Sequence, residues 1–359
     1  MKDIMLMARA EYGDALREEA ARRWGAELLT PVDPDEPDVV RFSGSSALRV
    51  WREGRDSLIF AAQWLADPVL VPPAKSGAPP DPGMLEGLAV LAGGTASWTV
   101  HTFASGRKGE PGPSKTAGML GDALLATCAE RVPDLYARYV PPRQAGADTK
   151  VFQICLTSRG AWWSLMQARD LLDRFPGGEH RMPFDSGAPC RSYLKIEEAF
   201  DVMGCSPGRG EKVVDLGASP GGWSYAFSKR GCDVLAVDRG PMKIEDRHSS
   251  GGRVRHMRVD GIGFRPPPGW DRTDWLACDM LVAPGVTFGL LRRWIGEGAL
   301  HRFVVNVKLP QEQPDPVLEP LETYLRSVPG LRFRIRQLYH DRREVTLMGE
   351  LGRVRKKQK

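Results

Sequence analysis

The spacing of apolar residues divides the chain into two parts. After about residue 190, short apolar runs alternate with segments whose apolar residues recur every three or four positions. The runs are typical of strands buried on both faces, and the periodic segments are typical of amphipathic helices. The expected strands are 213–216, 234–238, 257–260, 275–279, 303–308, 333–339 and 344–348. The expected helices are 192–200, which ends near Gly204, then 224–230 and 288–294.

This alternation predicts a doubly wound α/β sheet of the Rossmann-like class. Only residues 340–343 separate the last two expected strands. A parallel crossover needs roughly a dozen residues or more, so these two strands must form a C-terminal antiparallel hairpin.

The N-terminal part predicts a compact α+β unit instead. Helices are expected at 13–24 and 116–131, and strands near the N-terminus and at 39–42, 97–103 and 151–157. Stretches rich in proline and glycine are expected to be linkers or loops, and they lie at 72–83, 106–115 and 175–189. Arg107 and Lys108 make the second of these a basic loop.

Composition sets limits on the class of protein. The 359 residues exceed what one core usually supports, so two domains are expected. No apolar run approaches the roughly 18 to 20 residues of a membrane span. Residues 1–10 do not resemble a signal peptide, so we expect a soluble, cytoplasmic protein with no membrane attachment. The six cysteines and six histidines lack ligand spacing, so neither a metal site nor a disulfide framework is expected.

The net charge of +5 is mild and decides little. Basic residues gather at 253–255, 332–336 and 353–359, and such clusters can neutralise phosphates. For the last cluster we favour the simpler interpretation of a basic tail without a partner.

A glycine-rich loop follows the first strand of the C-terminal part, at 215–223 (DLGASPGGW). Its glycines let the backbone turn tightly and pass close to a ligand. The loop lacks the G-x-G-x-x-G fingerprint of dinucleotide sites and the lysine of phosphate loops. Asp215 would repel a pyrophosphate but suits the ammonium and sulfonium groups of S-adenosylmethionine.

Acidic residues follow the next strands at the same edge of the predicted sheet. Asp238 is placed to accept from ribose hydroxyls and Asp260, beside Gly261, from an adenine amino group, while Asp279 ends the fourth strand. One such acid often only caps a turn, but four successive strand ends with acids are a stronger signal. The predicted cofactor contacts are Asp215, Gly217, Ser219, Pro220, Gly221, Gly222, Trp223, Asp238, Asp260 and Asp279.

These segments resemble the bacterial 23S ribosomal RNA 2′-O-ribose cytidine methyltransferase M family. The matching segments are 215–224, 237–242, 278–280, 306–310 and 336–346, with 56–64 and 188–192 in the rest of the chain. The resemblance therefore spans nearly the whole chain, and its most specific parts are the loop and the hairpin. Ser219 stands where the family often has cysteine, and the N-terminal half departs more from the family pattern.

The resemblance implies a catalytic tetrad of Lys195, Asp279, Lys308 and Glu344, and it adds Ser192 to the cofactor contacts. A ribose 2′-hydroxyl must lose its proton as the methyl group arrives, and Lys308 is the expected general base. The ordinary pKa of a lysine is about 10.4. We expect burial and the like charge of Lys195 to lower the pKa of Lys308, while the two acids orient the amines.

The resemblance also implies the domain order. It predicts a ferredoxin-like α+β subdomain at 1–65, a THUMP-type RNA-binding domain at 66–175, a linker at 176–190, the methyltransferase domain at 191–352 and a basic tail at 353–359. The expected cofactor is S-adenosylmethionine without a metal, and the expected partner is 23S rRNA or its assembly precursor. No obligate protein partner is expected, and a monomer is favoured. Trp162 and Trp163 are either core residues or base-stacking groups.

Three other functions share parts of this pattern. An oxidoreductase with a nucleotide cofactor has the same fold class but needs the dinucleotide fingerprint. A non-catalytic RNA-binding or ribosome-assembly factor does not need the tetrad. A methyltransferase of the same chemistry could act on another RNA. Methyltransferases that act on exocyclic amines require an N-P-P-Y segment, and those that act on cytosine C5 require a Pro-Cys pair at the fourth strand end. The sequence has neither motif.

Overall fold

The structure is a computed structural model of the 359-residue chain. It describes residues 1–9, 11–30, 33–72, 80–105, 111–246, 248–270, 272–298, 300–310 and 314–352. The chain forms two compact units, Met1–Glu179 and His180–Lys359. No helix in the described ranges is long and apolar enough to cross a membrane.

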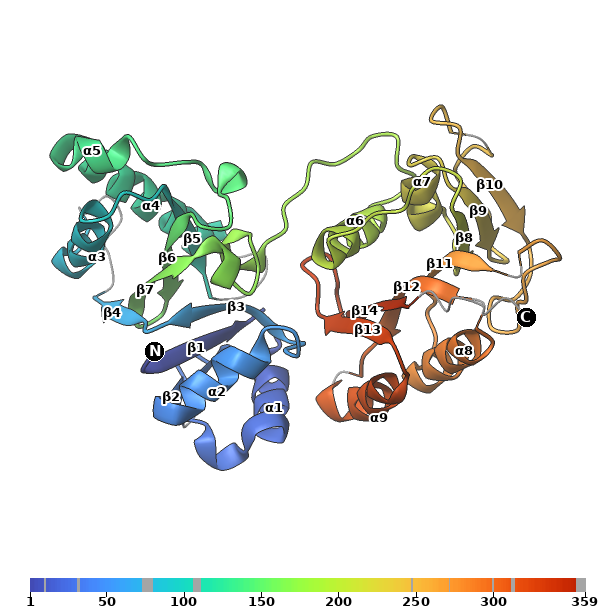
Figure 1. The fold of residues 1–359 in the computed structure, drawn as a ribbon, viewed down its shortest axis with the longest axis horizontal. Helices are drawn as coiled ribbons and strands as arrows, with labels where there is room; N and C mark the ends of the chain where they lie inside the picture. Colours follow the sequence, from blue (N-terminus) through green and yellow to red (C-terminus); the bar gives the residue numbers. More distant parts are fainter. Residues whose placement is uncertain are drawn as a thin grey trace, which may run out of the picture. The chain divides into compact units, whose positions relative to one another are not determined.

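The first unit is an α+β unit with two sheets, coloured blue to green in Figure 1. Its strands are β1 (Asp3–Ala8), β2 (Val39–Ser43), β3 (Ala61–Ala66), β4 (Val69–Val71), β5 (Trp98–Ala104), β6 (Lys150–Thr157) and β7 (Gly160–Gln167). Its α-helices are α1 (Gly13–Trp24), α2 (Gly44–Gly54), α3 (Pro82–Ala92), α4 (Pro111–Arg131) and α5 (Pro133–Tyr136). One sheet has the order β2-β1-β3 and the other β4-β7-β6-β5.

Both sheets of the first unit bury apolar side chains. Trp163 on β7 stacks on Phe152 of β6 in the core beneath α3 and α4. Trp162 points to the other face, where it packs with Met5 and Phe103. Both tryptophans are less than 10% exposed, so the structure places them in the core and not on a surface for stacking bases.

The predicted basic loop is partly wrong, because α4 already begins at Pro111 and takes in the second half of 106–115. Proline is favoured in the first turn of a helix, where its missing N–H has no partner to lose. Arg107, Lys108, the basic tail 353–359 and most of the linker-like stretch 72–83 lie outside the described residues.

The second unit is the predicted doubly wound sheet. Its strands are β8 (Lys212–Leu216), β9 (Asp233–Val237), β10 (Arg253–Met257), β11 (Thr273–Cys278), β12 (Leu300–Lys308), β13 (Leu331–Arg336) and β14 (Glu344–Leu351). Its helices are α6 (Tyr193–Met203), α7 (Gly222–Ser228), α8 (Pro284–Gly296) and α9 (Pro314–Ser327). The sheet order is β10-β9-β8-β11-β12-β14-β13. Figure 1 shows α6 and α7 on one side of this sheet and α8 and α9 on the other.

The C-terminal hairpin is confirmed, because β14 runs antiparallel to β13 and also to β12. Since β14 enters the sheet between these two strands, its first residue lies beside the last residue of β12. The register pairs Lys308 with Glu344. This insertion brings the start of one strand to the edge where the parallel strands end.

The third predicted strand is wrong in position. The strand is β10 at Arg253–Met257, whereas 257–260 was expected. As the edge strand it is only partly buried, with exposed arginines at 253 and 255 around buried Val254, so it lacks the apolar run by which inner strands are recognised. Asp260 therefore lies beyond the strand end, in the connection to β11.

The segment 180–190 packs on the second unit. The imidazole of His180 lies 2.9 Å from the carboxylate of Asp201 on α6. Tyr225 on α7 donates to Asp185 over 3.0 Å, and Lys229 forms an ion pair with the same carboxylate. Much of the segment predicted as a linker is thus fixed to the helices beside the predicted site.

Candidate active site

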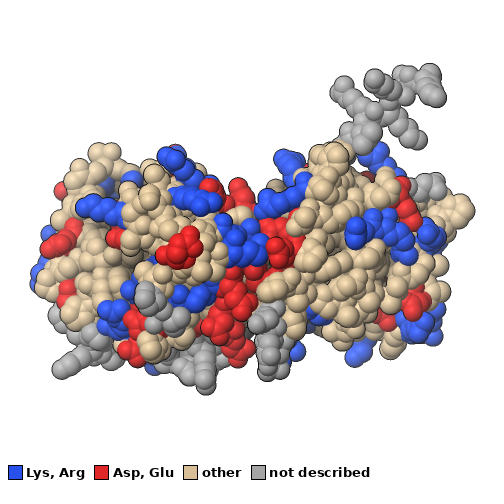
Figure 2. All heavy atoms as spheres, turned by 90° about the horizontal axis from the view of Figure 1, so that it is seen from below, with Lys and Arg blue, Asp and Glu red and all other residues tan. Residues whose placement is uncertain are grey.

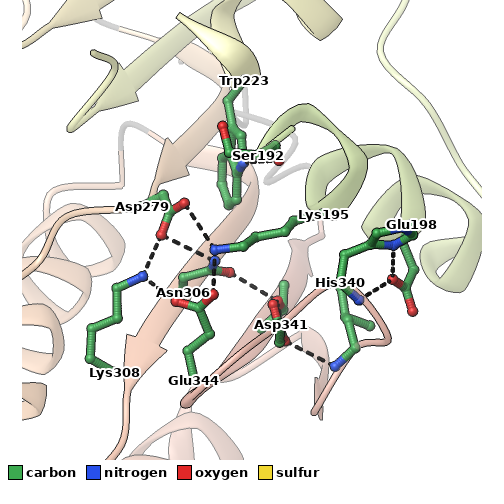
Figure 3. A network of polar contacts seen from close by, with 12 residues as sticks. Ser192, Lys195, Glu198, Trp223, Asp279, Asn306, Lys308, His340, Asp341 and Glu344 are labelled. Atoms are coloured by element: carbon green, nitrogen blue, oxygen red, sulfur yellow. Dashed lines mark hydrogen bonds and ion pairs between the residues drawn. The ribbon is translucent and has the colours of Figure 1, made fainter. Parts of the chain in front are cut away.

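The four residues of the predicted tetrad lie together at the carboxyl edge of the second sheet. Lys195 comes from the first turn of α6, Asp279 follows β11, Lys308 ends β12 and Glu344 begins β14. Figure 3 shows the two amines and two carboxylates pointing toward one another. Four segments far apart in the sequence therefore supply one polar cluster.

Each lysine of the tetrad contacts both acids. Lys308 Nζ lies 2.6 Å from Asp279 Oδ1, and Lys195 Nζ lies 3.3 Å from Asp279 Oδ2. Glu344 forms close ion pairs with both lysines, one through each of its carboxylate oxygens. All four side chains are at most 20% exposed, so water screens these ion pairs only weakly.

The expected lowering of the Lys308 pKa is wrong for the free protein. Burial lowers the pKa of Lys308, but the carboxylates of Asp279 and Glu344 outweigh burial and raise it above the ordinary value. The counterpart is Glu344: burial raises its pKa, but Lys195 and Lys308 outweigh burial and lower it. The expected shift rested on burial and on the like charge of Lys195. The two carboxylates in direct contact with Lys308 have the larger effect on its pKa.

The glycine loop lies beside this cluster. Gly217 has a φ of 77°, and a Cβ atom there would come within 2.7 Å of Met280, the residue after Asp279. A Cβ atom at Gly222 would lie 2.3 Å from Ser192 Oγ at the start of α6. Glycine at these two positions therefore allows the loop to approach the segments that carry Asp279 and Lys195.

Asp238 holds the loop in place. Its Oδ2 accepts from the backbone N–H of Ser219 over 3.0 Å, and its Oδ1 accepts from the N–H of Gly240. A carboxylate has about four acceptor positions, so two remain for the hydroxyls of a ribose. The cis peptide bond between Ser219 and Pro220 and the φ of 116° at Gly221 complete the turn into α7.

Two predicted cofactor residues lie buried beneath the loop. Asp215 is 1% exposed and accepts from the hydroxyl of Ser224 over 2.6 Å. Burial raises the pKa of Asp215 to about 7. Trp223 is 3% exposed and donates its Nε1–H to the backbone oxygen of Ser192. These contacts favour a role in holding the loop, and direct contact of either side chain with a cofactor stays a prediction.

Asp260 is exposed, as a ligand-contacting residue can be. Its Oδ1 accepts from the N–H of Ile262 over 2.8 Å, and its Oδ2 forms an ion pair with Arg239. Its contact with an adenine amino group stays a prediction.

Six residues next to the tetrad were not predicted as site residues. Asn306 donates to Asp279 over 3.2 Å, and Thr346 and Asp341 continue from it into the hairpin. Glu198 on α6 accepts from the N–H groups of Tyr339 and His340 and contacts the His340 ring. Asn306 could have been found, because residues two apart on a strand face the same side and Lys308 follows it by two.

The donor set fits S-adenosylmethionine. The loop offers backbone at close range, Asp238 offers free acceptor positions for hydroxyls, and Asp260 offers an exposed carboxylate. Within the described ranges, no group of three or more His, Cys, Asp or Glu side chains is placed to hold a metal ion.

Comparison with known proteins agrees with this site. The FtsJ-like methyltransferase family matches residues 188–286, a range that includes the loop, the start of α6 and Asp279. This segment of the second unit is therefore similar to FtsJ-like methyltransferases. A domain of this family implies S-adenosylmethionine as the methyl donor.

Similar curated proteins include several called ribosomal RNA large subunit methyltransferase M. The protein from Laribacter hongkongensis is 44% identical over 180 residues, 46% of this chain and 48% of its own length. Those from Marinomonas sp. and Azotobacter vinelandii are 38% and 40% identical, and each match covers 48% of this chain and 51% and 50% of the relative. The chain thus spans about half the length of the curated relatives it matches, and the family resemblance predicted from the sequence is confirmed over that half.

Proposed function

We propose that this protein is an S-adenosylmethionine-dependent 2′-O-ribose methyltransferase that modifies a cytidine of 23S ribosomal RNA. The observation that carries the proposal is the cluster of Lys195, Asp279, Lys308 and Glu344 beside the glycine loop of a methyltransferase domain. A binding protein has no need for two buried ammonium groups held between two carboxylates.

The chemistry of the cluster suits a hydroxyl acceptor. A ribose 2′-hydroxyl is a poor nucleophile and needs a base within hydrogen-bond reach. We assign that role to Lys308, which must first release its own proton, and Glu344 and Asp279 then orient the neutral amine toward the hydroxyl. When bound, S-adenosylmethionine supplies a methyl carbon that the oxygen attacks, while the carbon–sulfur bond breaks to leave a neutral thioether. The hydroxyl proton passes to Lys308 Nζ, and the balance needs no metal ion.

The choice of RNA rests on the relatives, whose names place their action on large-subunit ribosomal RNA. The substrate is 23S rRNA or a precursor particle that contains it. We assign RNA binding to the first unit, as a THUMP-type domain preceded by a ferredoxin-like subdomain. Figure 2 shows Lys and Arg side chains on both units, in separate groups mixed with acidic residues. Contacts with several phosphates by such groups would make the affinity fall with salt.

The proposal is tested by mapping 2′-O-methyl groups in ribosomal RNA from cells with and without the protein. A single cytidine of 23S rRNA that loses its methyl group supports the proposal. An unchanged 23S map with a lost methyl group on another RNA would replace the substrate, and no loss on any RNA would favour a non-catalytic assembly role.

The base is tested with Lys308→Ala. This variant should lose methyl transfer to unmodified rRNA while calorimetry still measures binding of S-adenosylhomocysteine. The matched control is Lys212→Ala, because Lys212 begins β8 at the opposite edge of the sheet and should be dispensable. Wild-type methylation by Lys308→Ala would exclude Lys308 as the base.

A further inference from the structure

The tetrad is continued by a buried polar chain that the proposed reaction does not use. Asn306 and Thr346 are fully buried and Asp341 is 2% exposed. Asn306 lies on β12, Thr346 on β14 and Asp341 in the turn between β13 and β14. Figure 3 shows Asn306 beside Asp279 and Asp341 deeper in the hairpin.

The donor and the acceptor of each hydrogen bond in this series of side chains can be assigned in turn, beginning at Asp279. Asp279 is ion-paired with both lysines and acts as a carboxylate, so Asn306 must present its Nδ2–H group to Asp279 Oδ1, 3.2 Å away. Turning the amide over would place two acceptor oxygens against each other. The Asn306 Oδ1 atom therefore faces Thr346, and the hydroxyl of Thr346 must donate to it over 2.9 Å.

Once Thr346 donates to Asn306, it has no hydrogen left for Asp341. Thr346 Oγ1 nevertheless lies 3.1 Å from Asp341 Oδ1 and 3.0 Å from Asp341 Oδ2. Oδ2 already accepts from the N–H of Leu338 over 2.9 Å. A hydroxyl oxygen facing an ionised carboxylate without a hydrogen between them would be repelled, and burial makes that repulsion costly.

We infer that Asp341 is a protonated carboxylic acid that donates through Thr346 and Asn306 to fix the Asp279 carboxylate, and that it is a positioning residue for the methyltransferase site. In this arrangement the side chains of Asp341, Thr346, Asn306 and Asp279 meet in hydrogen bonds that each join one donor to one acceptor. The inference rests on the proposed function only for what is positioned, because the protonation state follows from the contacts alone.

The charges around Asp341 support the same assignment. The tetrad has two ammonium groups and two carboxylates and is neutral without a third acid. Burial raises the pKa of Asp341 well above its ordinary value, and Glu344 and Glu198 raise it further, against the N–H of Leu338 and the cation Lys195. An ionised Asp341 would add an uncompensated buried charge, which is strongly unfavourable.

The protonation state is tested by infrared difference spectroscopy of the full-length protein at pH 7. We expect the C=O band of a protonated carboxylic acid in the wild type and its loss in Asp341→Asn. Asp215, with a pKa of about 7, contributes a separate band that Asp341→Asn leaves in place. If the substitution removes no such band, Asp341 is ionised and the inference is overturned. The measurement needs no RNA, so it stands whether or not the chain methylates rRNA.

The positioning role is tested by kinetics with three variants. Asn can donate to Thr346 and accept from Leu338 as the protonated acid does, so Asp341→Asn should keep kcat within about threefold of wild type. Thr346→Val keeps the size and removes the hydroxyl, so kcat should fall by about tenfold to a hundredfold, with the KM for RNA unchanged. The matched control is Thr346→Ser, which keeps the hydroxyl and should keep most of the wild-type kcat.

The outcomes separate the two roles. Wild-type kcat in Thr346→Val would show that the hydrogen bonds from Asp341 through Thr346 and Asn306 do not position Asp279. An equal loss in Thr346→Ser and Thr346→Val would show that packing matters and the hydroxyl does not. If Thr346→Val fails to fold, Thr346→Ala, which also removes the hydroxyl, takes its place with the same expected loss of kcat. Wild-type kcat in Thr346→Ala would then overturn the positioning role.

Discussion

At the residue scale, the free protein holds the proposed base, Lys308, in the protonation state that cannot act as a base. Lys308 lies between two carboxylates that raise its pKa, so it is an ammonium at neutral pH. An ammonium cannot accept the proton of a hydroxyl. A cationic methyl donor arriving nearby would oppose those carboxylates, because a like charge disfavours the protonated form. Binding of the cofactor and activation of the base are then coupled by charge.

The rate of methyl transfer should therefore rise with pH. Since only the deprotonated amine acts, and its pKa in the free protein lies above the ordinary lysine value, kcat/KM should increase about tenfold per pH unit between roughly pH 6.5 and 8.5. Single-turnover methylation of RNA across this range measures the slope. A plateau below pH 7.5 would show that a group of lower pKa controls the reaction.

At the element scale, the site depends on the contact between α6 and the β13–β14 turn. Glu198 is 1% exposed and accepts from Tyr339 N–H over 2.7 Å and from His340 N–H over 3.0 Å. The same helix carries Lys195 one turn earlier, and the same turn leads to Glu344. The Glu198 carboxylate thus ties together the two elements that bring an amine and an acid of the tetrad.

Loss of that carboxylate should destabilise the second unit. Glu198→Gln turns an N–H group toward backbone N–H groups, and a buried donor left without a partner costs about 1–3 kcal/mol. We expect a loss of about 2–4 kcal/mol in the free energy of unfolding and a fall in kcat. Urea unfolding with activity assays measures both. The matched control is Glu197→Gln on the same helix. Its ion pair with Arg230 is 21% to 26% exposed and is therefore partly screened by water, so this substitution should cost less, about 1 kcal/mol.

The strands could be predicted from the pattern of apolar residues, whereas the resemblance supplied all four residues of the tetrad. Sheet geometry explains why two of them meet: parallel strands end at one edge of a sheet, so Asp279 and Lys308 at successive strand ends had to lie close together. Lys195 and Glu344 come from a helix and an antiparallel strand, for which strand ends give no such rule. Glu198, His340 and Asp341 could not be predicted, since their contacts arise only when α6 packs on the hairpin. The direction of the Lys308 pKa shift depends on distances that no spacing rule gives.

At the scale of the whole molecule, the division between the units lies at Glu179 and His180. The predicted methyltransferase domain began at residue 191. The intervening segment belongs with the second unit by its contacts: Asp185 binds Tyr225 and Lys229, and His180 is 2% exposed beside Asp201. The segment thus braces α6 and α7, the helices on either side of the glycine loop.

A fragment of residues 180–359 should therefore be more stable than one of residues 191–359. The longer fragment should bind S-adenosylhomocysteine about as tightly as the full chain, while the shorter one should bind more weakly and unfold at lower temperature. Calorimetry and thermal unfolding measure both. Both fragments should lose methylation of RNA if the first unit binds it. Equal affinity and equal unfolding temperature of the two fragments would show that the segment is a passive linker.

The insertion of β14 between β12 and β13 has a consequence for how the protein is made. The ribosome synthesises Lys195, Asp279 and Lys308 before Glu344, and the last strand of the sheet must enter between two strands already present. Without Glu344, the ammonium groups of Lys195 and Lys308 would share a single carboxylate, that of Asp279. Entry of the final strand therefore completes the sheet and balances the charge of the tetrad in the same step.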